Sequence, residues 1–237
     1  MKKPIGYTRA IHVDPLPMQT DYTAPLALWI VACLHPCRDG SISIEPVWVG
    51  SDEHGGLAIF VSRLHAGIYA ALRNACHTDD DTNSWFCLPL QLFDLHAYAV
   101  EMDTTLNCAL TFGFGCDAEG ALIIENGAPR LRYFNAAFKL PDRIAEVTFS
   151  FGGWVFDAIR MQWDEIGAHA HVESIASIEA MDDGAFARAL YIALQAATLT
   201  RDEGESDCWT VYEAGTASWI VAPAYGMASL QNSRTLH

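Results

Sequence analysis

Residues 56–76, which decide the fold class, read GLAIFVSRLHAGIYAALRNAC. The run from Leu57 to Val61 is short, continuous and apolar, as in a buried strand. Ser62 is a good helix N-cap, because its hydroxyl can accept hydrogen bonds from the first backbone amides of a helix. The stretch therefore predicts a buried strand that leads directly into an amphipathic helix. The apolar positions of that helix recur at spacings of four and three, at Leu64, Ile68, Leu72 and Ala75.

Upstream of this stretch the pattern indicates antiparallel strands. Residues 26–34 form a second apolar run, and residues 41–49 alternate but are interrupted by Pro46, as in an edge or bulged strand. The turn between these two runs contains Asp39-Gly40, a strong hairpin signal. Together with residues 57–61 they predict a three-stranded antiparallel meander.

Downstream of the helix, the pattern favours strands first and helices later. A short strand from Trp85 is expected to give way to a helix after Pro89. Later helices are predicted at residues 154–166 and 186–199, the second capped by Asp182 or Asp183. The remaining predicted strands lie at residues 106–114, 121–125, 131–138, 147–151, 208–213 and 219–222, and the first two are expected to form a hairpin around residues 117–120.

These elements predict an α+β fold, with a mainly antiparallel sheet and a few packed helices. Residues 1–25 are expected to form an extended lead-in, and residues 26–225 one compact domain. If the domain has two lobes, their boundary is expected near Pro141. Residues 226–237 are predicted to be a disordered tail.

The amino-acid composition indicates how large a core the chain can bury and in which cellular compartment it is expected. Hydrophobic residues make up 51% of the 237 residues and charged residues 18%, so the chain can bury a sizeable core. The longest apolar run is too short to span a bilayer. The seven cysteines are odd in number and lie mostly in apolar segments, as expected for reduced, buried thiols. Since no apolar signal segment follows Met1, the chain is predicted to be cytoplasmic.

Acidic charge is the most unusual bulk property. The 29 Asp and Glu residues outnumber the 14 Lys and Arg residues, for a formal net charge of −15 at pH 7. This balance disfavours nucleic acids and anionic membranes, since both bind through Lys and Arg side chains. It favours a partner with a basic surface, which complementary charge would steer toward the chain. The alternative interpretation is that the charge only maintains solubility.

Partner-binding residues are expected where carboxylates and aromatic rings come together. A polar loop contains Asp79, Asp80 and Asp81, and Trp85 and Phe86 follow it closely. Loops often carry binding residues, and aromatic anchors supply much of the affinity of a protein interface. These five residues are therefore the predicted partner-binding site.

A second candidate site lies where the helix predicted at residues 154–166 ends. Glu165 and His169 would lie one turn apart if the helix continued, and His169 and His171 would point the same way if the chain were extended. With Asp164, either arrangement could hold a divalent metal or support acid–base catalysis. The competing interpretation is a polar helix end, where histidine interacts favourably with the helix dipole. No clear third and fourth ligands lie nearby, so no cofactor is predicted.

Zinc-type ligands also cluster near the first predicted turn. Cys33, His35 and Cys37 are close in sequence, and Cys76 and His77 could join them only if the chain folded back. Structural zinc usually takes four ligands with Cys-x-x-Cys spacing, which this cluster lacks. A buried Cys33 beside an exposed turn is expected instead.

The familiar catalytic and phosphate-binding motifs do not occur in the sequence. Gly113-Phe-Gly115 superficially suggests a phosphate loop, but the Lys-Ser/Thr pair is missing and no helix is predicted after it. The Gly-x-Ser-x-Gly nucleophile motif does not occur, and the adjacent Cys76 and His77 point apart. These features favour a binding protein over an enzyme.

Residues 26–115 resemble the SseB N-terminal domain-like proteins. The resemblance is carried by Gly56-Leu-Ala-Ile-Phe60-Val-Ser62, an apolar strand ending in Phe and Ser that precedes an Ala-rich helix and follows a strand pair. Val61 between Phe60 and Ser62 departs from the family pattern. Such proteins are associated with secretion systems, so the resemblance implies an interaction protein and assigns no catalytic residue.

The leading prediction is therefore a non-enzymatic, acidic protein that captures a basic partner protein, such as an immunity protein or a secretion-associated protein. The first alternative is a metal-dependent or acid–base enzyme that uses Asp164, Glu165, His169 and His171. The second is a small-molecule-binding module with an aromatic pocket. Oligomeric state is not predicted.

Overall fold

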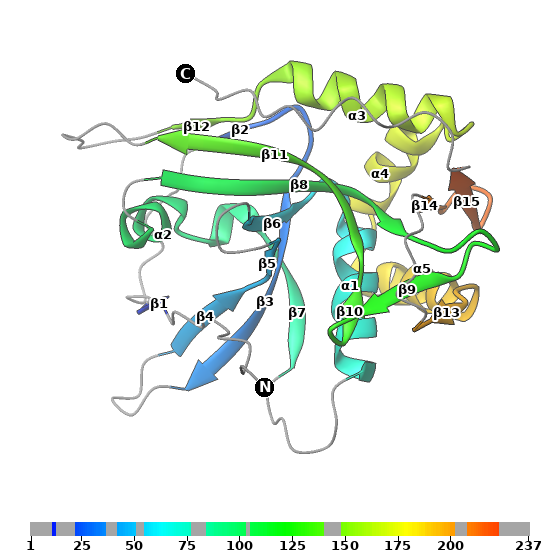
Figure 1. Cartoon of the computed structure of the whole chain (residues 1–237), viewed down its shortest axis with the longest axis horizontal. Helices are drawn as coiled ribbons and strands as arrows, with labels where there is room; N and C mark the ends of the chain where they lie inside the picture. The colour runs from blue at the N-terminus through cyan, green and yellow to red at the C-terminus, as the bar shows by residue number, and fades with distance from the viewer. Residues whose placement is uncertain are drawn as a thin grey trace.

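The structure is a computed structural model with an α+β fold, which confirms the predicted class (Figure 1). It describes residues 11–12, 22–36, 42–50, 55–76, 84–102, 105–139, 148–201 and 208–222. The predicted Asp39-Gly40 turn, the boundary near Pro141 and the tail at residues 226–237 lie outside these ranges. Within them, no helix combines the length and apolar character needed to cross a membrane.

Five α-helices and one short 3₁₀ helix are described. The helices are α1 Arg63–Cys76, η1 Leu90–Leu92, α2 Leu95–Glu101, α3 Gly153–Glu165, α4 His171–Glu179 and α5 Asp183–Gln195. The first strands are β1 Ile11–His12, β2 Tyr22–Thr23, β3 Trp29–Pro36, β4 Ile42–Pro46, β5 Trp48–Val49, β6 Gly56–Phe60, β7 Trp85–Pro89 and β8 Thr105–Gly115. The later strands are β9 Leu122–Glu125, β10 Ala128–Pro129, β11 Leu131–Lys139, β12 Phe149–Ser150, β13 Leu199–Thr200, β14 Trp209–Glu213 and β15 Ser218–Ala222.

A ten-stranded mixed sheet organises the fold. Its main order is β1-β4-β3-β6-β8-β14-β15, while β11, β5 and β7 pair with β8, β6 and β3 respectively. The pair β6–β8 is parallel and its neighbours are antiparallel. This parallel pair requires a crossover, which α1, β7 and α2 provide. Two small sheets, β10-β9-β13 and β12-β2, lie outside the main one.

Strand β6 is buried on both faces, which explains its continuous apolar sequence. Leu57 and Ile59 belong to the core cluster that also contains residues of α2 and α3. Ala58 and Phe60 belong to the second cluster, which contains residues of α1 and α5. Helices therefore cover both faces of the sheet.

The strand-to-helix unit predicted from residues 56–76 is confirmed. The Ser62 hydroxyl accepts a hydrogen bond from the His65 amide at 3.4 Å, as an N-cap should. The second predicted cap is also present, because the Asp182 side chain accepts from the Ala185 amide at 2.7 Å at the start of α5. The last two predicted strands are also present, and they pair with each other as the antiparallel hairpin of β14 and β15.

The predicted antiparallel pairings of the first three strands are present, but the strand order is not that of a meander. Residues 41–49 contain two strands: β4 pairs with β3, and β5 pairs with β6. Strand β3 also pairs directly with β6 and therefore lies between β4 and β6.

The predicted hairpin at residues 106–125 is right only at its turn. The chain reverses at residues 117–120, and an antiparallel bridge joins Cys116 to Leu122. Beyond this bridge the two strands take other partners, because β8 pairs along its length with β11 and β9 pairs with β10 and β13. A sequence pattern gives the faces of a strand but not its partner.

Candidate functional site

The outer face of α3 carries two large apolar side chains. Trp154 is 48% exposed and Met161 is 61% exposed, although both types are usually covered. They lie seven positions apart, about two helical turns, so they share one face with Ala158 between them. The opposite face of α3 is buried against the sheet through Val155, Phe156, Ile159, Gln162 and Trp163.

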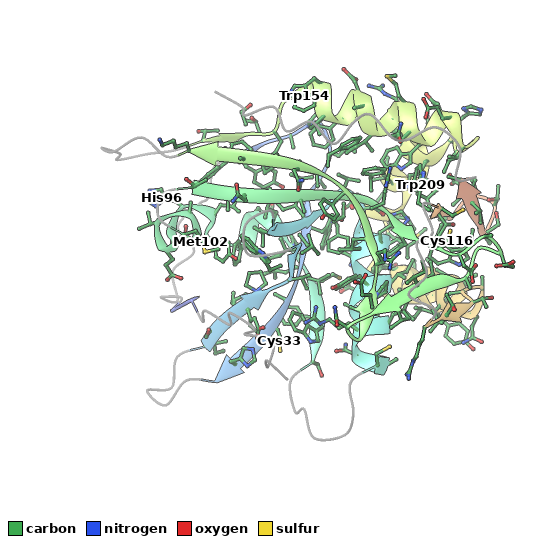
Figure 2. All side chains as sticks on the ribbon, viewed as in Figure 1. Cys33, His96, Met102, Cys116, Trp154 and Trp209 are labelled. Carbon is green, nitrogen blue, oxygen red and sulfur yellow. The ribbon has the colours of Figure 1, made fainter. Side chains whose placement is uncertain are left out.

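Trp154 stands at the start of α3, on the periphery of the molecule (Figure 2). Its indole lies against Gly152, where an added Cβ would come within 3.0 Å of the indole Cδ1. A side chain at position 152 would therefore crowd the ring. Gly152 leaves room for the Trp154 ring, which remains half exposed.

Carboxylates flank these apolar side chains. Asp157, Asp164 and Glu165 are exposed on the same side of α3, and Arg160, paired with Asp157, is the one basic residue of the helix. The face therefore combines apolar anchors with an excess of negative charge. We call Trp154, Asp157, Met161, Asp164 and Glu165 the α3 face.

The candidate residues at the end of α3 separate into two environments. His169 lies on the surface with its Nδ1 3.2 Å from Asp164 Oδ1. Glu165 accepts a hydrogen bond from Gln162 Nε2 at 3.1 Å. His171 instead begins α4 and is buried. Glu165, His169 and His171 do not converge, and no metal-binding group of three or more His, Cys, Asp or Glu residues occurs in the described part of the chain.

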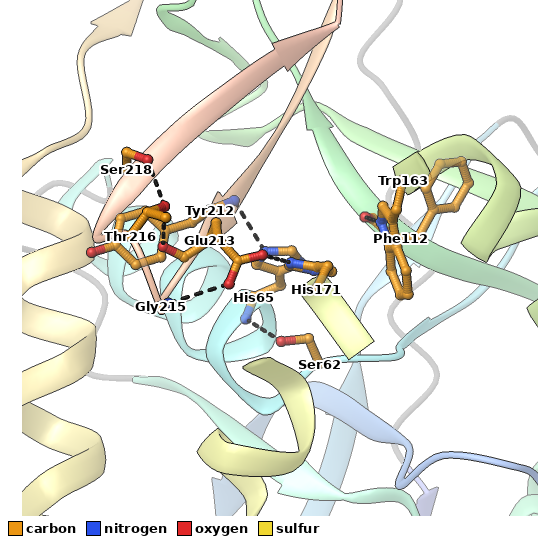
Figure 3. Close-up of polar contacts among 10 residues, drawn as sticks. All are labelled: Ser62, His65, Phe112, Trp163, His171, Tyr212, Glu213, Gly215, Thr216 and Ser218. Carbon is orange, nitrogen blue, oxygen red and sulfur yellow. Dashed lines mark hydrogen bonds and ion pairs between the residues drawn. The ribbon is translucent and has the colours of Figure 1, made fainter. Parts of the chain in front are cut away.

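Buried His171 belongs to a polar cluster with His65 of α1 and Glu213 of β14 (Figure 3). Its Nδ1 is 3.4 Å from Glu213 Oε2, within ion-pair distance, although neither atom makes a hydrogen bond to a described residue. Glu213 Oε1 accepts from the Gly215 amide at 3.2 Å, and His65 Nε2 accepts from the Tyr212 amide at 3.4 Å. The cluster joins helices α1 and α4 to strand β14 inside the core.

Burial and neighbouring charges set the protonation of this cluster. Desolvation, and secondarily the nearby His171, lower the pKa of His65 from 6.5 to about 3. Interaction with His171 outweighs desolvation and lowers the pKa of Glu213 from 4.5 to about 2. At neutral pH His65 is thus a neutral imidazole and Glu213 a carboxylate.

Sequence reasoning did not identify His65 or Glu213. His65 falls inside the helix predicted after Ser62, and Glu213 ends a predicted strand, so neither stands in a recognisable motif. Both side chains are almost fully covered, as is His171. The cluster is therefore suited to holding elements together and responding to pH rather than to contacting a substrate.

The aromatic residues predicted to bind a partner lie in or near the core. Trp85 is only 8% exposed and packs beneath Arg73, whose guanidinium carbon is 3.7 Å from the ring centroid. Asn74 fixes its backbone with two hydrogen bonds of 2.8 Å. Phe86 is half-buried, and the adjacent Asp79-Asp80-Asp81 triplet lies outside the described residues. Trp85 therefore offers little surface to a partner.

The cysteine–histidine cluster near the first predicted turn has other contacts. Cys33 is buried, as expected from the sequence, and His35 Nε2 lies 2.5 Å from Glu45 Oε2 on the neighbouring strand. Cys37 and His77 are not among the described residues.

Gly113 and Gly115 have a packing role in β8. A Cβ at Gly113 would lie 2.8 Å from the Trp209 ring, and one at Gly115 would lie 2.9 Å from the Arg130 side chain. The two glycines thus let large side chains lie directly on the strand. No protein-family model matches the chain, and no curated protein or solved structure matches it either.

Proposed function

We propose that this chain is a protein-binding protein that captures a basic partner through the α3 face. The observation that carries the proposal is the exposure of Trp154 and Met161 on one helical face edged by carboxylates. Aromatic residues and methionine are enriched at protein interfaces and tryptophan is a frequent hot spot. A partner with apolar pockets and a basic rim would match this face.

Charge distinguishes the α3 face from a second exposed apolar surface, which lies on α5. On α5, Tyr191 and Ile192 are exposed and border a shallow hollow of about 400 Å³ together with Ala187 and Arg188. That hollow is lined by a basic residue and by no acidic one. A basic partner is therefore favoured at α3, where Asp157, Asp164 and Glu165 would complement it.

Affinity and rate would come from different residues of the α3 face. Burying the exposed parts of Trp154 and Met161 would contribute most of the binding energy, because apolar burial stabilises by roughly 25 cal/mol per Å². The carboxylates would mainly accelerate encounter and fix orientation. The net charge of −15 adds longer-range attraction that weakens with salt.

The resemblance to SseB N-terminal domain-like proteins, which are associated with secretion systems, implies the same class of function, a protein that binds other proteins. An immunity protein that neutralises a basic toxin and a secretion-associated protein are both members of the proposed class. Identification of the captured partner would distinguish them.

The proposal is tested by affinity capture from an extract of the cells that make the protein. The wild-type chain should retain a basic protein, and a Trp154→Ala, Met161→Ala double variant should lose it. A Tyr191→Ala, Ile192→Ala variant on α5 is the matched control, since it removes similar apolar area, and it should retain the same protein. If the wild type retains no basic protein, or the two variants lose it equally, the proposal is wrong.

A further inference from the structure

Two cysteines lie side by side at the adjoining ends of two neighbouring strands, since Cys116 directly follows β8 and Cys208 directly precedes β14. In the ladder between β8 and β14, Trp209 pairs with Gly115 and Thr210 with Phe114, in antiparallel register. Continuing this register by one residue places Cys208 opposite Cys116. A backbone hydrogen bond of 3.1 Å from the Cys116 amide to the Cys208 carbonyl confirms the juxtaposition.

The backbone spacing is within reach of a disulfide. Directly opposite residues of an antiparallel pair have Cα atoms about 5.5 Å apart at a hydrogen-bonded position, inside the range of about 4.4–6.8 Å that disulfides span, and their side chains project to the same face. The Cβ atoms at such a position are also about 5.5 Å apart, wider than the roughly 3.5–4.5 Å of a disulfide, so the two strands must close by about 1 Å to form the bond. Both residues are thiols in this structure. Burial raises the pKa of Cys116 to about 12, and electrostatic repulsion from Cys208 adds to this rise. The two thiols are therefore close enough to interact.

The two thiols differ in access. Cys116 is fully buried, whereas Cys208 is 9% exposed and lines a hollow of about 340 Å³ together with Trp209 and Gly115. Figure 2 shows Cys116 and Trp209 at the same end of the molecule. Cys208 is therefore the more accessible of the two residues.

We propose that Cys116 and Cys208 form a redox site that a low-molecular-weight disulfide, such as glutathione disulfide, oxidises to a cross-strand disulfide. The Cys208 thiolate attacks one sulfur of the reagent and forms a mixed disulfide, and one reagent thiol leaves. The Cys116 thiolate then attacks the Cys208 sulfur, and the second reagent thiol leaves. Two protein thiols are oxidised and one reagent disulfide is reduced to two thiols.

Oxidation would fasten β14 to β8 beside Trp209. The bond would close a long loop of chain, which restricts the unfolded state and raises stability. Because burial disfavours the Cys116 thiolate, the second step should be slow near neutral pH and faster as the pH rises. The redox site is independent of the α3 face.

Cys33 and Cys87 provide an internal control. They lie on the paired strands β3 and β7, but Val31 is opposite Cys87 and Trp85 is opposite Cys33. The two cysteines are therefore diagonal neighbours, about 7–8 Å apart, which is beyond the roughly 6.8 Å between Cα atoms that disulfides span.

The test is equilibration of the folded protein with glutathione disulfide, followed by thiol alkylation, chymotrypsin digestion and mass spectrometry. Chymotrypsin cuts at Phe112 and Phe114 and so separates Cys108 from Cys116. We expect a linked Cys116–Cys208 peptide, no Cys33–Cys87 peptide, and a higher urea midpoint that dithiothreitol reverses. In Cys116→Ser, Cys208 should carry one stable glutathione; in Cys208→Ser, Cys116 should remain a thiol.

Two results would overturn the proposal. One is wild-type protein in which Cys116 and Cys208 remain thiols after equilibration, or form the bond only in urea. The other is a mapped disulfide that pairs either residue with a different cysteine. The wild-type mapping does not depend on whether the serine variants fold.

Discussion

The imidazole of His65 on α1 stacks on the imidazole of His171 on α4, with ring centroids 5.3 Å apart and ring planes inclined by 26°. Both rings are buried, so two positive charges could not be accommodated there. The only carboxylate in this cluster belongs to Glu213, which contacts His171. The stability of the fold should therefore depend on pH.

The direction of this pH dependence follows from the lowered pKa values of His65 and Glu213. The folded protein holds a proton on His65 less readily than the unfolded chain, so His65 reduces stability progressively as the pH falls from 6.5 toward 3. Glu213 contributes stability above pH 4.5 that is lost as the pH falls toward 2. Each group changes the free energy of unfolding by at most about 1.4 kcal/mol per pH unit.

Replacing His65 by Gln should flatten this dependence between pH 6.5 and 4.5. The amide can still accept from the Tyr212 amide but has no proton to gain. Urea denaturation at several pH values measures the effect, and His96→Gln on α2, whose side chain is only partly buried, is the control. A His65→Gln variant with the same pH slope as the wild type would show that His65 does not govern it.

Trp163→Phe should destabilise the fold by about 1–3 kcal/mol. The buried Trp163 indole donates a hydrogen bond of 3.1 Å to the Phe112 carbonyl and contacts the His171 ring edge-on. Trp154→Phe, on the exposed face of the same helix, should change stability by less than about 0.5 kcal/mol. Thermal or urea unfolding measures the stability of both variants. An equal loss of stability in Trp163→Phe and Trp154→Phe would contradict the assigned packing.

Gly113→Ala and Gly153→Ala should act in opposite directions. The first places a Cβ 2.8 Å from the Trp209 ring and 3.0 Å from the Thr210 carbonyl oxygen, so it should cost roughly 1–3 kcal/mol. The Cβ added in Gly153→Ala meets no atom within 4 Å at the first position of α3. This change should stabilise the fold by about 0.4–1 kcal/mol, because Ala reduces the conformational freedom of the unfolded chain. A tolerated Gly113→Ala variant would mean that Trp209 does not lie on β8.

Local sequence signals predicted the elements of this fold better than their pairing. Ser62 and Asp182 marked helix starts because a cap acts on amides within three residues. The pairing of β8 with β11 could not be predicted, because both β9 and β11 offered apolar runs and periodicity does not choose between them. The α+β class followed from the types of the elements alone.

The candidate sites also depend on tertiary packing, which the sequence alone does not reveal. Trp85 and Phe86 look like anchors beside an acidic loop, but the stacking of Arg73 on Trp85 depends on the packing of α1 against β7. The helix at residues 154–166 was predicted, but apolar residues occur on more than one of its faces, so the sequence does not say which face is buried. Only tertiary packing shows that Val155, Ile159 and Trp163 form the buried face.

The central claim is that a basic protein docks on the α3 face. A photo-crosslinking amino acid at position 161 tests it most directly in an extract of the producing cells, with the same amino acid at position 191 of α5 as the matched site. The account predicts one adduct from position 161, with a basic protein, that weakens as salt is raised and is missing from position 191. An adduct from position 191 alone, or an acidic or salt-insensitive adduct at position 161, would contradict it.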